Sequence, residues 1–473
     1  MLNSIKSLPL AALACVSLGA TASLAQENYS TAWSGHKNVI INTSTTQGGA
    51  GVTGNVIGFP VLVRLGAADS AIFTQSLATG ADLRFTKANN TTRLPHQIES
   101  WNAAGRSAAV WVLVDTVYGN QNAQYIRMHW GNASAADSSR GTQVFRTAAG
   151  FQAVWHMSGA TDAANENDAT ANGFTATAVN NPMPAAGAVA GARQFSGSQY
   201  FNTTGTESGP LSFPAGGNYT ISAWINPVEL AAHGVIVSKH DRQYAMKLDQ
   251  NNNLEFFEFN GGWNAVNAFA DQGIWRHAVG IQRGTEAELY LDGARADFGI
   301  INTASGSARE ENIQVVIGAE PTSATAFRRY FIGLIDELRM SDVARSADWV
   351  RLEFENQKSG ATMVKLLDTV PTSLARVMRS GETGLGVKAY AGGLAFNITD
   401  RTASKARVTL VDMWGRTVWS QVADVRGGRT VVWNGRALGG QPAAQGVYAV
   451  RVNLLDEKGS SLRVVERKVP LTR

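Results

Sequence analysis

Hydrophobic and polar residues alternate with a period of two along many short stretches of this chain, and this period is typical of half-buried β-strands. In residues 125–130, Ile126, Met128 and Trp130 share one face, and the residues between them share the other. Two further β-rich runs bounded by glycine and polar turns are residues 59–65 and 109–115. These runs predict a β-sandwich, which we place at residues 26–145.

A second β-rich segment is predicted at residues 150–357. Its clearest strands are residues 219–225, 288–293 and 313–318, with turn residues between them. A short helix is expected after Ser346, because Val350 and Phe354 lie four residues apart on one face.

A third segment is predicted at residues 387–473. It is separated from the second by residues 358–386, a predicted linker that contains Pro371 and several Ser, Gly and Thr residues. Within the segment, Asn434-Gly435 is a strong hairpin signal between two strand-like runs. The fold class predicted for the chain is therefore all-β, with tandem β-sandwiches.

The composition favours a secreted protein. Only 16% of the 473 residues are charged, and 48 are glycine, a profile typical of turn-rich β proteins. Hydrophobic residues make up 44%, which is enough for cores without disulfides at this length. No disulfide can form within the chain, because Cys15 is its only cysteine.

The first 25 residues are predicted to be a secretory signal peptide. Lys6 supplies the positive start, residues 8–22 are small and apolar, and residues 23–25 form a small-x-small cleavage site. The alternative is a lipoprotein signal acylated at Cys15, which we disfavour because the apolar run before it is short. No later stretch is long enough to span a membrane, so we expect a secreted or outer-surface protein.

Charge is distributed unevenly. Residues 361–473 contain 17 Lys and Arg against 8 Asp and Glu, so this end of the chain is basic. A basic surface could contact an anionic envelope or glycan, or it could be an ordinary solvated face. No nucleic-acid motif is present, so no nucleic-acid partner is expected.

The first segment resembles the domain of unknown function family 2341. The residues that carry this resemblance are 59–63, 82–85, 94–101, 110–112 and 130–132. The family usually has Glu where this chain has Gln97. The family has no established chemistry, so the resemblance implies an architecture without a mechanism.

The second segment resembles laminin-G-like, concanavalin A-like jelly rolls. The matching blocks, in order, are residues 154–157 with 162 and 167–168, then 192–195, 219–224, 275–277, 289–293 and 331–340, followed by the short helix after Ser346. The resemblance implies a domain that binds glycans or proteins more often than it catalyses. In such domains the aspartate of the closing strand, here Asp336, commonly helps to hold a structural calcium ion.

The third segment resembles the immunoglobulin-like C-terminal domains of flagellar-hook-cap type, which also serve as sorting signals for type IX secretion in some Gram-negative bacteria. The matching residues are 415–416, 433–435, 446–448 and 467–469. The resemblance implies an export or attachment domain, with the cell envelope or the secretion machinery as its partner.

Calcium is the one cofactor predicted. Asp162, Asn167 and Asp168 lie in an acidic, Asn-rich loop, and the resemblance places this loop against the strand that holds Asp336. Together they would supply the oxygen ligands that Ca²⁺ prefers. The alternative is a loop whose side chains bond its own backbone, with Asp336 paired to Arg339.

A sugar-binding surface is predicted around Trp263, Phe257 and Asn264. Exposed aromatic rings can stack on sugars, and amides can bind hydroxyl groups. Trp263 follows two glycines and is a better exposed candidate than Trp224 or Trp275, which we interpret as core residues. The alternative is that Trp263 is packed like most tryptophans.

No catalytic motif is recognised. The Glu-x-Asp-x-Glu and Glu-x-Asp-x-x-Glu patterns of jelly-roll glucanases are absent, and Asp336 and Glu337 are adjacent, so in a regular strand they would diverge. No pair of histidines has zinc-site spacing.

The sequence therefore predicts a secreted or surface protein of a Gram-negative bacterium that is not an enzyme. Its predicted partner is a polysaccharide or glycoconjugate, bound through the jelly roll. The alternatives are a structural or adhesive protein that binds other proteins, and a polysaccharide hydrolase or lyase, which the missing carboxylate motif disfavours.

Overall fold

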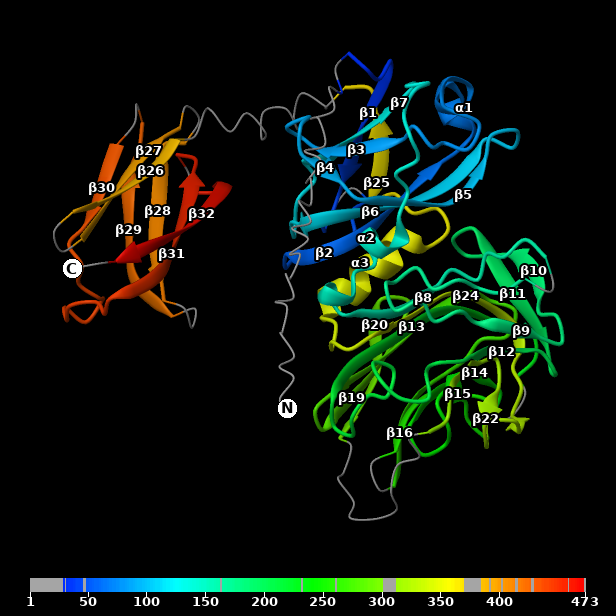
Figure 1. Ribbon diagram of the computed structural model, residues 1–473. Coiled ribbons are helices and arrows are strands. Elements are labelled where there is room, and N and C mark those ends of the chain that lie inside the picture. The colour runs from blue at the N-terminus through cyan, green and yellow to red at the C-terminus, as the bar shows by residue number, and fades with distance from the viewer. Residues whose placement is uncertain are drawn as a thin grey trace, which may run out of the picture. The chain divides into compact units, whose positions relative to one another are not determined.

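The structure, a computed structural model, describes most of the chain (Figure 1). The described residues are 29, 31–45, 48–161, 164–230, 233–259, 262–300, 312–369, 384–390, 393–400, 403–412, 416–426, 429–457 and 459–471. The chain divides into two compact units, Met1–Thr369 and Val370–Arg473. The predicted signal peptide, Cys15 and Asp162 lie outside the described residues.

The first unit begins with a sandwich of two antiparallel sheets, as the alternating pattern predicted. One sheet has the order β25-β1-β7-β3-β4 and the other has the order β2-β6-β5. The strands are β1 (Gly35–Ile41), β2 (Val56–Leu65), β3 (Arg84–Lys87), β4 (Arg93–Leu94), β5 (His96–Asn102), β6 (Ser107–Val117), β7 (Gln124–Trp130) and β25 (Val364–Leu367). Short helices connect them: η1 (Ala67–Asp69), α1 (Ser70–Gln75), α2 (Gly141–Val144) and η2 (Thr147–Ala149).

The jelly roll of the first unit has two large sheets. The sheet with the order β10-β11-β24-β13-β18-β19-β20 also pairs β8 with β24, and it faces a sheet with the order β17-β16-β15-β14-β21-β12-β9. Their strands are β8 (Phe151–Trp155), β9 (Thr177–Val179), β10 (Met183–Ala186), β11 (Gly191–Ser196), β12 (Tyr200–Thr203), β13 (Asn218–Pro227), β14 (Val235–Ser238), β15 (Tyr244–Leu248), β16 (Leu254–Phe259), β17 (Trp263–Ala268), β18 (Arg276–Arg283), β19 (Glu286–Leu291), β20 (Ala294–Ile300), β21 (Val315–Ile317) and β24 (Ile332–Ser341). A small ribbon pairs β22 (Glu320–Pro321) with β23 (Phe327–Arg328).

Helix α3 (Ala347–Gln357) lies between the sandwich and the jelly roll (Figure 1). Its N-cap is Ser346, whose side chain accepts a hydrogen bond from Trp349 N, as the predicted helix start requires. Trp349 and Leu352 pack in the sandwich core, whereas Val350 packs against the jelly roll with Val279 and Tyr290. The helix therefore joins the two halves of the first unit.

The predicted start of the linker, residue 358, is too early, because a strand of the first unit follows it. β25 lies inside residues 358–386 and pairs antiparallel with β1 at the edge of the sandwich sheet, with Val364 opposite Ile41. Met363 is buried in the sandwich core, so the chain returns to the first domain after the jelly roll. The strand was missed because it is only four residues long and none of the four is fully buried. Residues 370–383 of the predicted linker lie outside the described residues.

The second unit is a smaller antiparallel sandwich. A sheet of order β26-β27-β30 and a sheet of order β29-β28-β31-β32 enclose a core that includes Phe396, Trp433 and Val450. The strands are β26 (Gly384–Tyr390), β27 (Gly393–Thr399), β28 (Lys405–Val411), β29 (Thr417–Asp424), β30 (Arg429–Trp433), β31 (Gly446–Leu455) and β32 (Ser461–Leu471). The predicted fold class, all-β with tandem sandwiches, is confirmed. Among the described residues, no helix is long and apolar enough to cross a membrane.

Candidate functional site

A polar cavity of about 350 Å³ opens where the sandwich meets the jelly roll. Its lining comes from β5 and α2 of the sandwich, and from the segment that follows β8 in the jelly roll. The lining residues are Gln97, Ile98, Glu99, Gly141, Thr142, His156, Ser158, Gly159, Asn165, Glu166, Asn167, Asp168 and Ala169. Most of them carry amide, hydroxyl, carboxylate or imidazole groups, so the cavity suits a hydrophilic ligand.

Glu99 reaches the base of this cavity because β5 contains a β-bulge. The register with β6 shifts between Ile98 and Ser100, so Glu99 has no paired residue opposite it. Its carboxylate turns inward: Trp111 Nε1 donates a hydrogen bond of 2.7 Å to Oε2, and the side chain is 1% exposed. Oε1 has no hydrogen-bond partner among the described residues.

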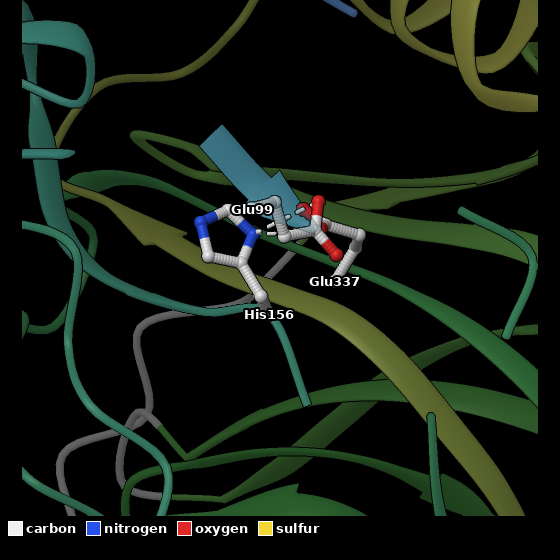
Figure 2. A group of neighbouring side chains, drawn as sticks. All are labelled: Glu99, His156 and Glu337. Carbon is white, nitrogen blue, oxygen red and sulfur yellow. Dashed lines mark hydrogen bonds and ion pairs between the residues drawn. The ribbon is translucent and has the colours of Figure 1, made fainter. Parts of the chain in front are cut away.

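His156 follows β8 and lies between two carboxylates. Its Nδ1 is 2.6 Å from Glu337 Oε1 and 3.7 Å from Glu99 Oε2. On the other side of the ring, Nε2 is 3.3 Å from Gln97 Oε1. Figure 2 shows the imidazole and the two carboxylates converging from three separate segments of the first unit.

A second β-bulge places Glu337. The register of β24 with β13 shifts between Ser222 and Trp224, and Glu337 has a left-handed backbone with φ 51°. Ile335 and Leu338, three residues apart, both point into the jelly-roll core. The two acidic residues between them therefore lie outside that core, on the face toward the sandwich. In a regular strand they would have pointed to opposite faces.

The charged groups behind the cavity are connected. Arg339 donates to Glu337 Oε2 at 2.6 Å through Nη2 and to Glu353 Oε1 of α3 at 2.9 Å through Nη1. Its guanidinium carbon lies 4.4 Å from the centre of the Trp111 ring, a cation–π contact between the two domains. Arg64 of β2 donates to Asn356 O at 3.0 Å. This buried network joins strands of both domains to α3.

Burial drives the pKa values in this network apart. Desolvation, reinforced by the nearby Glu337, raises the pKa of Glu99 well above its usual range. Burial acts the same way on Glu337, but His156 and Arg339 outweigh it and lower its pKa to about 2. Burial alone would lower the pKa of His156, yet Glu337 and Glu99 raise it. Glu337 is therefore an anion, while Glu99 favours the neutral form.

Of the predicted calcium ligands, the structure describes Asn167, Asp168 and Asp336, and these three are not gathered into one cradle: the first two line the cavity and Asp336 does not. Both carboxylate oxygens of Asp168 are already used: they accept from Thr170 N, Thr170 Oγ1 and Phe174 N of the same loop and from Val154 N of β8. This agrees with the self-bonded loop of the alternative prediction. The other part of that alternative was wrong, because Arg339 pairs with Glu337 and Glu353 and not with Asp336. Asn167 lines the cavity, and its side chain is exposed to solvent.

Asp336 is fully buried, and its Oδ2 accepts from Val189 N at 2.9 Å. Its surroundings include the Arg64 charge, which interacts electrostatically with it. A lone carboxylate beside a guanidinium does not fit the many-oxygen shell of Ca²⁺. Calcium held by Asp336, Asn167, Asp168 and the undescribed Asp162 stays a prediction that this geometry does not favour.

The three predicted sugar-binding residues do not form one exposed surface. Trp263 is 67% exposed at the edge strand β17, and its Nε1 donates to Asp241 O at 2.9 Å. Phe257 is only 2% exposed and packs with Ala245. Asn264 donates to Gly262 O. Of the three, only Trp263 presents an aromatic face to solvent.

Sequence reasoning missed the Glu99–His156–Glu337 cluster, although all three residues lie in the motif blocks that carry the family resemblances. The cluster joins positions 57 and 181 residues apart, and both glutamates are turned by bulges. Zinc-site spacing and regular strand alternation are local signals, so neither could reveal this arrangement.

Two protein families match this chain. Residues 79–158 match a domain of unknown function, DUF2341, and residues 195–351 match the concanavalin A-like lectin/glucanases superfamily. The chain thus carries a DUF2341 domain followed by a concanavalin A-like jelly roll, which confirms these two resemblances. Glu99 and His156 fall in the first match, and Glu337 falls in the second. The immunoglobulin-like assignment of residues 387–473 stays a prediction. No curated protein matches the chain.

Several solved structures resemble part of the chain. Domain 4 of AbnA, a GH43 extracellular arabinanase from Geobacillus stearothermophilus solved with arabinotriose, is 19% identical, with a TM-score of 0.33, over 43% of this chain and 97% of its own. A SAP-like pentraxin from Limulus polyphemus is 17% identical, with a TM-score of 0.28, over 37% of this chain and 91% of its own. The binding domain of Paraclostridial Mosquitocidal Protein 1 is 11% identical, with a TM-score of 0.35, over 64% and 75%.

Proposed function

We propose that this protein is a non-catalytic glycan-binding protein, and that the polar cavity between the DUF2341 domain and the jelly roll is its binding site. The observation that supports this proposal is the lining of the cavity. Its volume of about 350 Å³ lies within the range of small-ligand sites, and hydrogen-bonding groups from both domains face into it. The lectin/glucanase superfamily of the jelly roll is consistent with a carbohydrate ligand.

Several cavity side chains are available for a ligand. Thr142, Ser158 and Asn167 make no side-chain hydrogen bond to any other described residue, so their hydroxyl and amide groups can bind sugar hydroxyls. The side chains of Glu166 and Asp168 are already engaged in internal hydrogen bonds and form rigid walls. Specificity would arise from the fixed positions of these groups, since a site built on hydrogen bonds rejects ligands that lack matching hydroxyls.

A hydrolase is the rival reading, because Glu99 and Glu337 are close and their pKa values shift in opposite directions. A glycosidase needs both carboxylates to flank the scissile bond. Glu337 does not line the cavity: its side chain is 1% exposed, and its two oxygens are held by His156 and Arg339. This engagement supports a binding role over a catalytic one.

Protein adhesion is a second candidate function, supported by exposed apolar side chains on the jelly roll. Trp263 of β17 and Phe298 and Ile300 of β20 are all at least 44% exposed, and β17 packs beside β20. Such a patch is typical of a protein-binding surface. The location that we propose remains secreted or outer-surface, with the second unit serving export or attachment.

The test is a glycan array with the full chain and two single variants, Asn167→Ala in the cavity and Trp263→Ala on β17. We expect selective binding by the wild type, loss of signal in N167A, and retention in W263A. Loss of signal only in W263A would move the site to the exposed tryptophan. A blank array from folded wild-type protein would refute glycan binding and favour adhesion.

A further inference from the structure

Three ligand-type atoms meet at the base of the cavity. They come from Glu99, His156 and Glu337, and they lie within 4.8 Å of one another. No other group of three His, Cys, Asp or Glu side chains in the described part of the chain is this close. Two carboxylates and one imidazole are the donor set of many transition-metal sites.

Each of the three side chains also contacts a polar group outside the cluster. Trp111 Nε1 donates to Glu99 Oε2, Arg339 donates to Glu337 Oε2, and Gln97 Oε1 contacts His156 Nε2. Within the cluster, His156 Nδ1 is 2.6 Å from Glu337 Oε1 and 3.7 Å from Glu99 Oε2. Outer hydrogen bonds of this kind orient metal ligands and fix the imidazole tautomer.

The contact with Gln97 identifies the ring nitrogen that a metal could use. An amide oxygen can only accept, so His156 Nε2 donates to Gln97 Oε1, and Nδ1 is the nitrogen left for a metal. A proton on Nδ1 donates to Glu337 Oε1 at 2.6 Å, and a bound ion would take the place of that proton. Glu99 Oε1 is buried and has no hydrogen-bond partner among the described residues, so an ion beside this carboxylate would also satisfy it.

We infer that Glu99, His156 and Glu337 form a divalent transition-metal site between the DUF2341 domain and the jelly roll. Zn²⁺ binds both imidazole nitrogens and carboxylate oxygens, whereas Ca²⁺ prefers a shell of oxygens alone. Glu99 and His156 also line the cavity, so a remaining coordination position is accessible to water or to a ligand hydroxyl. The inference does not depend on glycan binding.

The test measures Zn²⁺ binding to the metal-stripped full chain by calorimetry, and bound zinc by elemental analysis. We expect one Zn²⁺ per chain, a higher Tm with Zn²⁺, and no matching effect of Ca²⁺. The key variant is Glu99→Gln, because the amide keeps an oxygen for Trp111 and resembles the neutral acid. We expect E99Q to fold and to bind Zn²⁺ at least tenfold more weakly, as loss of a ligand requires.

The matched control is Asn167→Ala, which changes the same cavity outside the cluster and should leave the zinc affinity unchanged. Folded wild-type protein that takes up no Zn²⁺ would overturn the inference, and so would equal affinities of E99Q and the wild type. A chain that binds Zn²⁺ but no glycan refutes only the proposed function. A chain that binds glycan but no Zn²⁺ refutes only the metal site.

Discussion

Asn356, near the end of helix α3, forms both of its amide hydrogen bonds with one backbone residue, Leu62 of β2. Its Oδ1 accepts from Leu62 N at 2.7 Å, and its Nδ2 donates to Leu62 O at 3.0 Å. β2 is the edge strand of its sheet, so the asparagine occupies the place of a neighbouring strand. This side chain thus adds a polar attachment of α3 to the sandwich, beside the packing of Trp349 and Leu352 in the sandwich core.

Replacing this asparagine should destabilise the first unit strongly. Asn356→Ala leaves the N–H and the C=O of Leu62 buried without partners, and each such group costs about 1–3 kcal/mol. We expect the free energy of unfolding to fall by about 2–4 kcal/mol in a urea titration. Asn167→Ala, at an exposed asparagine, should change it by less than about 0.5 kcal/mol. Equal stability of the two variants would contradict the role of Asn356.

The jelly roll should not fold when it is cut out at its predicted boundaries, residues 150–357. Phe151, Trp349 and Leu352 belong to the core of the sandwich, so the fragment would expose them to water. We expect residues 150–357 to aggregate or to lack near-ultraviolet circular dichroism, and residues 26–369 to fold. A soluble, cooperatively unfolding 150–357 fragment would show that the two domains are independent.

His96 should make the first unit sensitive to acid. Burial, together with the charges of Arg84 and Arg93, lowers its pKa to about 3, and neither ring nitrogen has a hydrogen-bond partner among the described residues. The unfolded chain binds this proton at about pH 6.5, so the folded state loses stability as the pH falls from about 6.5 toward 3.

His96→Phe should remove that part of the pH dependence, since the ring at this position packs against Phe85. Denaturant titrations between pH 7 and pH 4 would show a shallower loss of stability in H96F than in the wild type. His36→Phe, at an exposed histidine, serves as the control and should follow the wild type. Parallel curves for H96F and the wild type would disprove the assignment.

The pair Glu166–Arg193 should matter more than a surface pair. Arg193 is fully buried, and its Nε donates to Glu166 Oε1 at 2.5 Å. Glu166→Gln leaves the guanidinium charge without its counterion, which costs about 3–5 kcal/mol in buried pairs. Asp115→Asn, which breaks the exposed pair with Lys87, should cost less than about 1 kcal/mol in the same thermal or urea assay. Similar losses in both variants would contradict this ranking.

Much of the fold could be predicted from local patterns. The alternation in residues 125–130 gave strand β7, Ser346 marked the start of α3, and Trp224 is buried as expected. β25 could not be predicted, because a strand of only four residues carries little periodic signal. Its identity as a strand depends on β1, more than 300 residues earlier.

The candidate site was less predictable, for a physical reason. The prediction that Asp336 and Glu337 diverge assumes a regular strand, and the bulge in β24 breaks that assumption. Trp263 is exposed as predicted, yet Phe257, which directly follows the core residue Phe256 on β16, is buried in a small cluster of its own. Side-chain direction at bulges and sheet edges depends on partner strands that the local sequence does not specify.

The pairing of β1 with β25 decides how the first unit would carry mechanical tension. Asn38 lies opposite Leu367, and its side chain also donates to the backbone oxygens of Leu367 and Asp368. The chain therefore enters and leaves this unit at adjacent points. Force applied to the flanking segments would therefore act first on the hydrogen bonds between β1 and β25. The cavity between the domains would experience that force only after these two strands had separated.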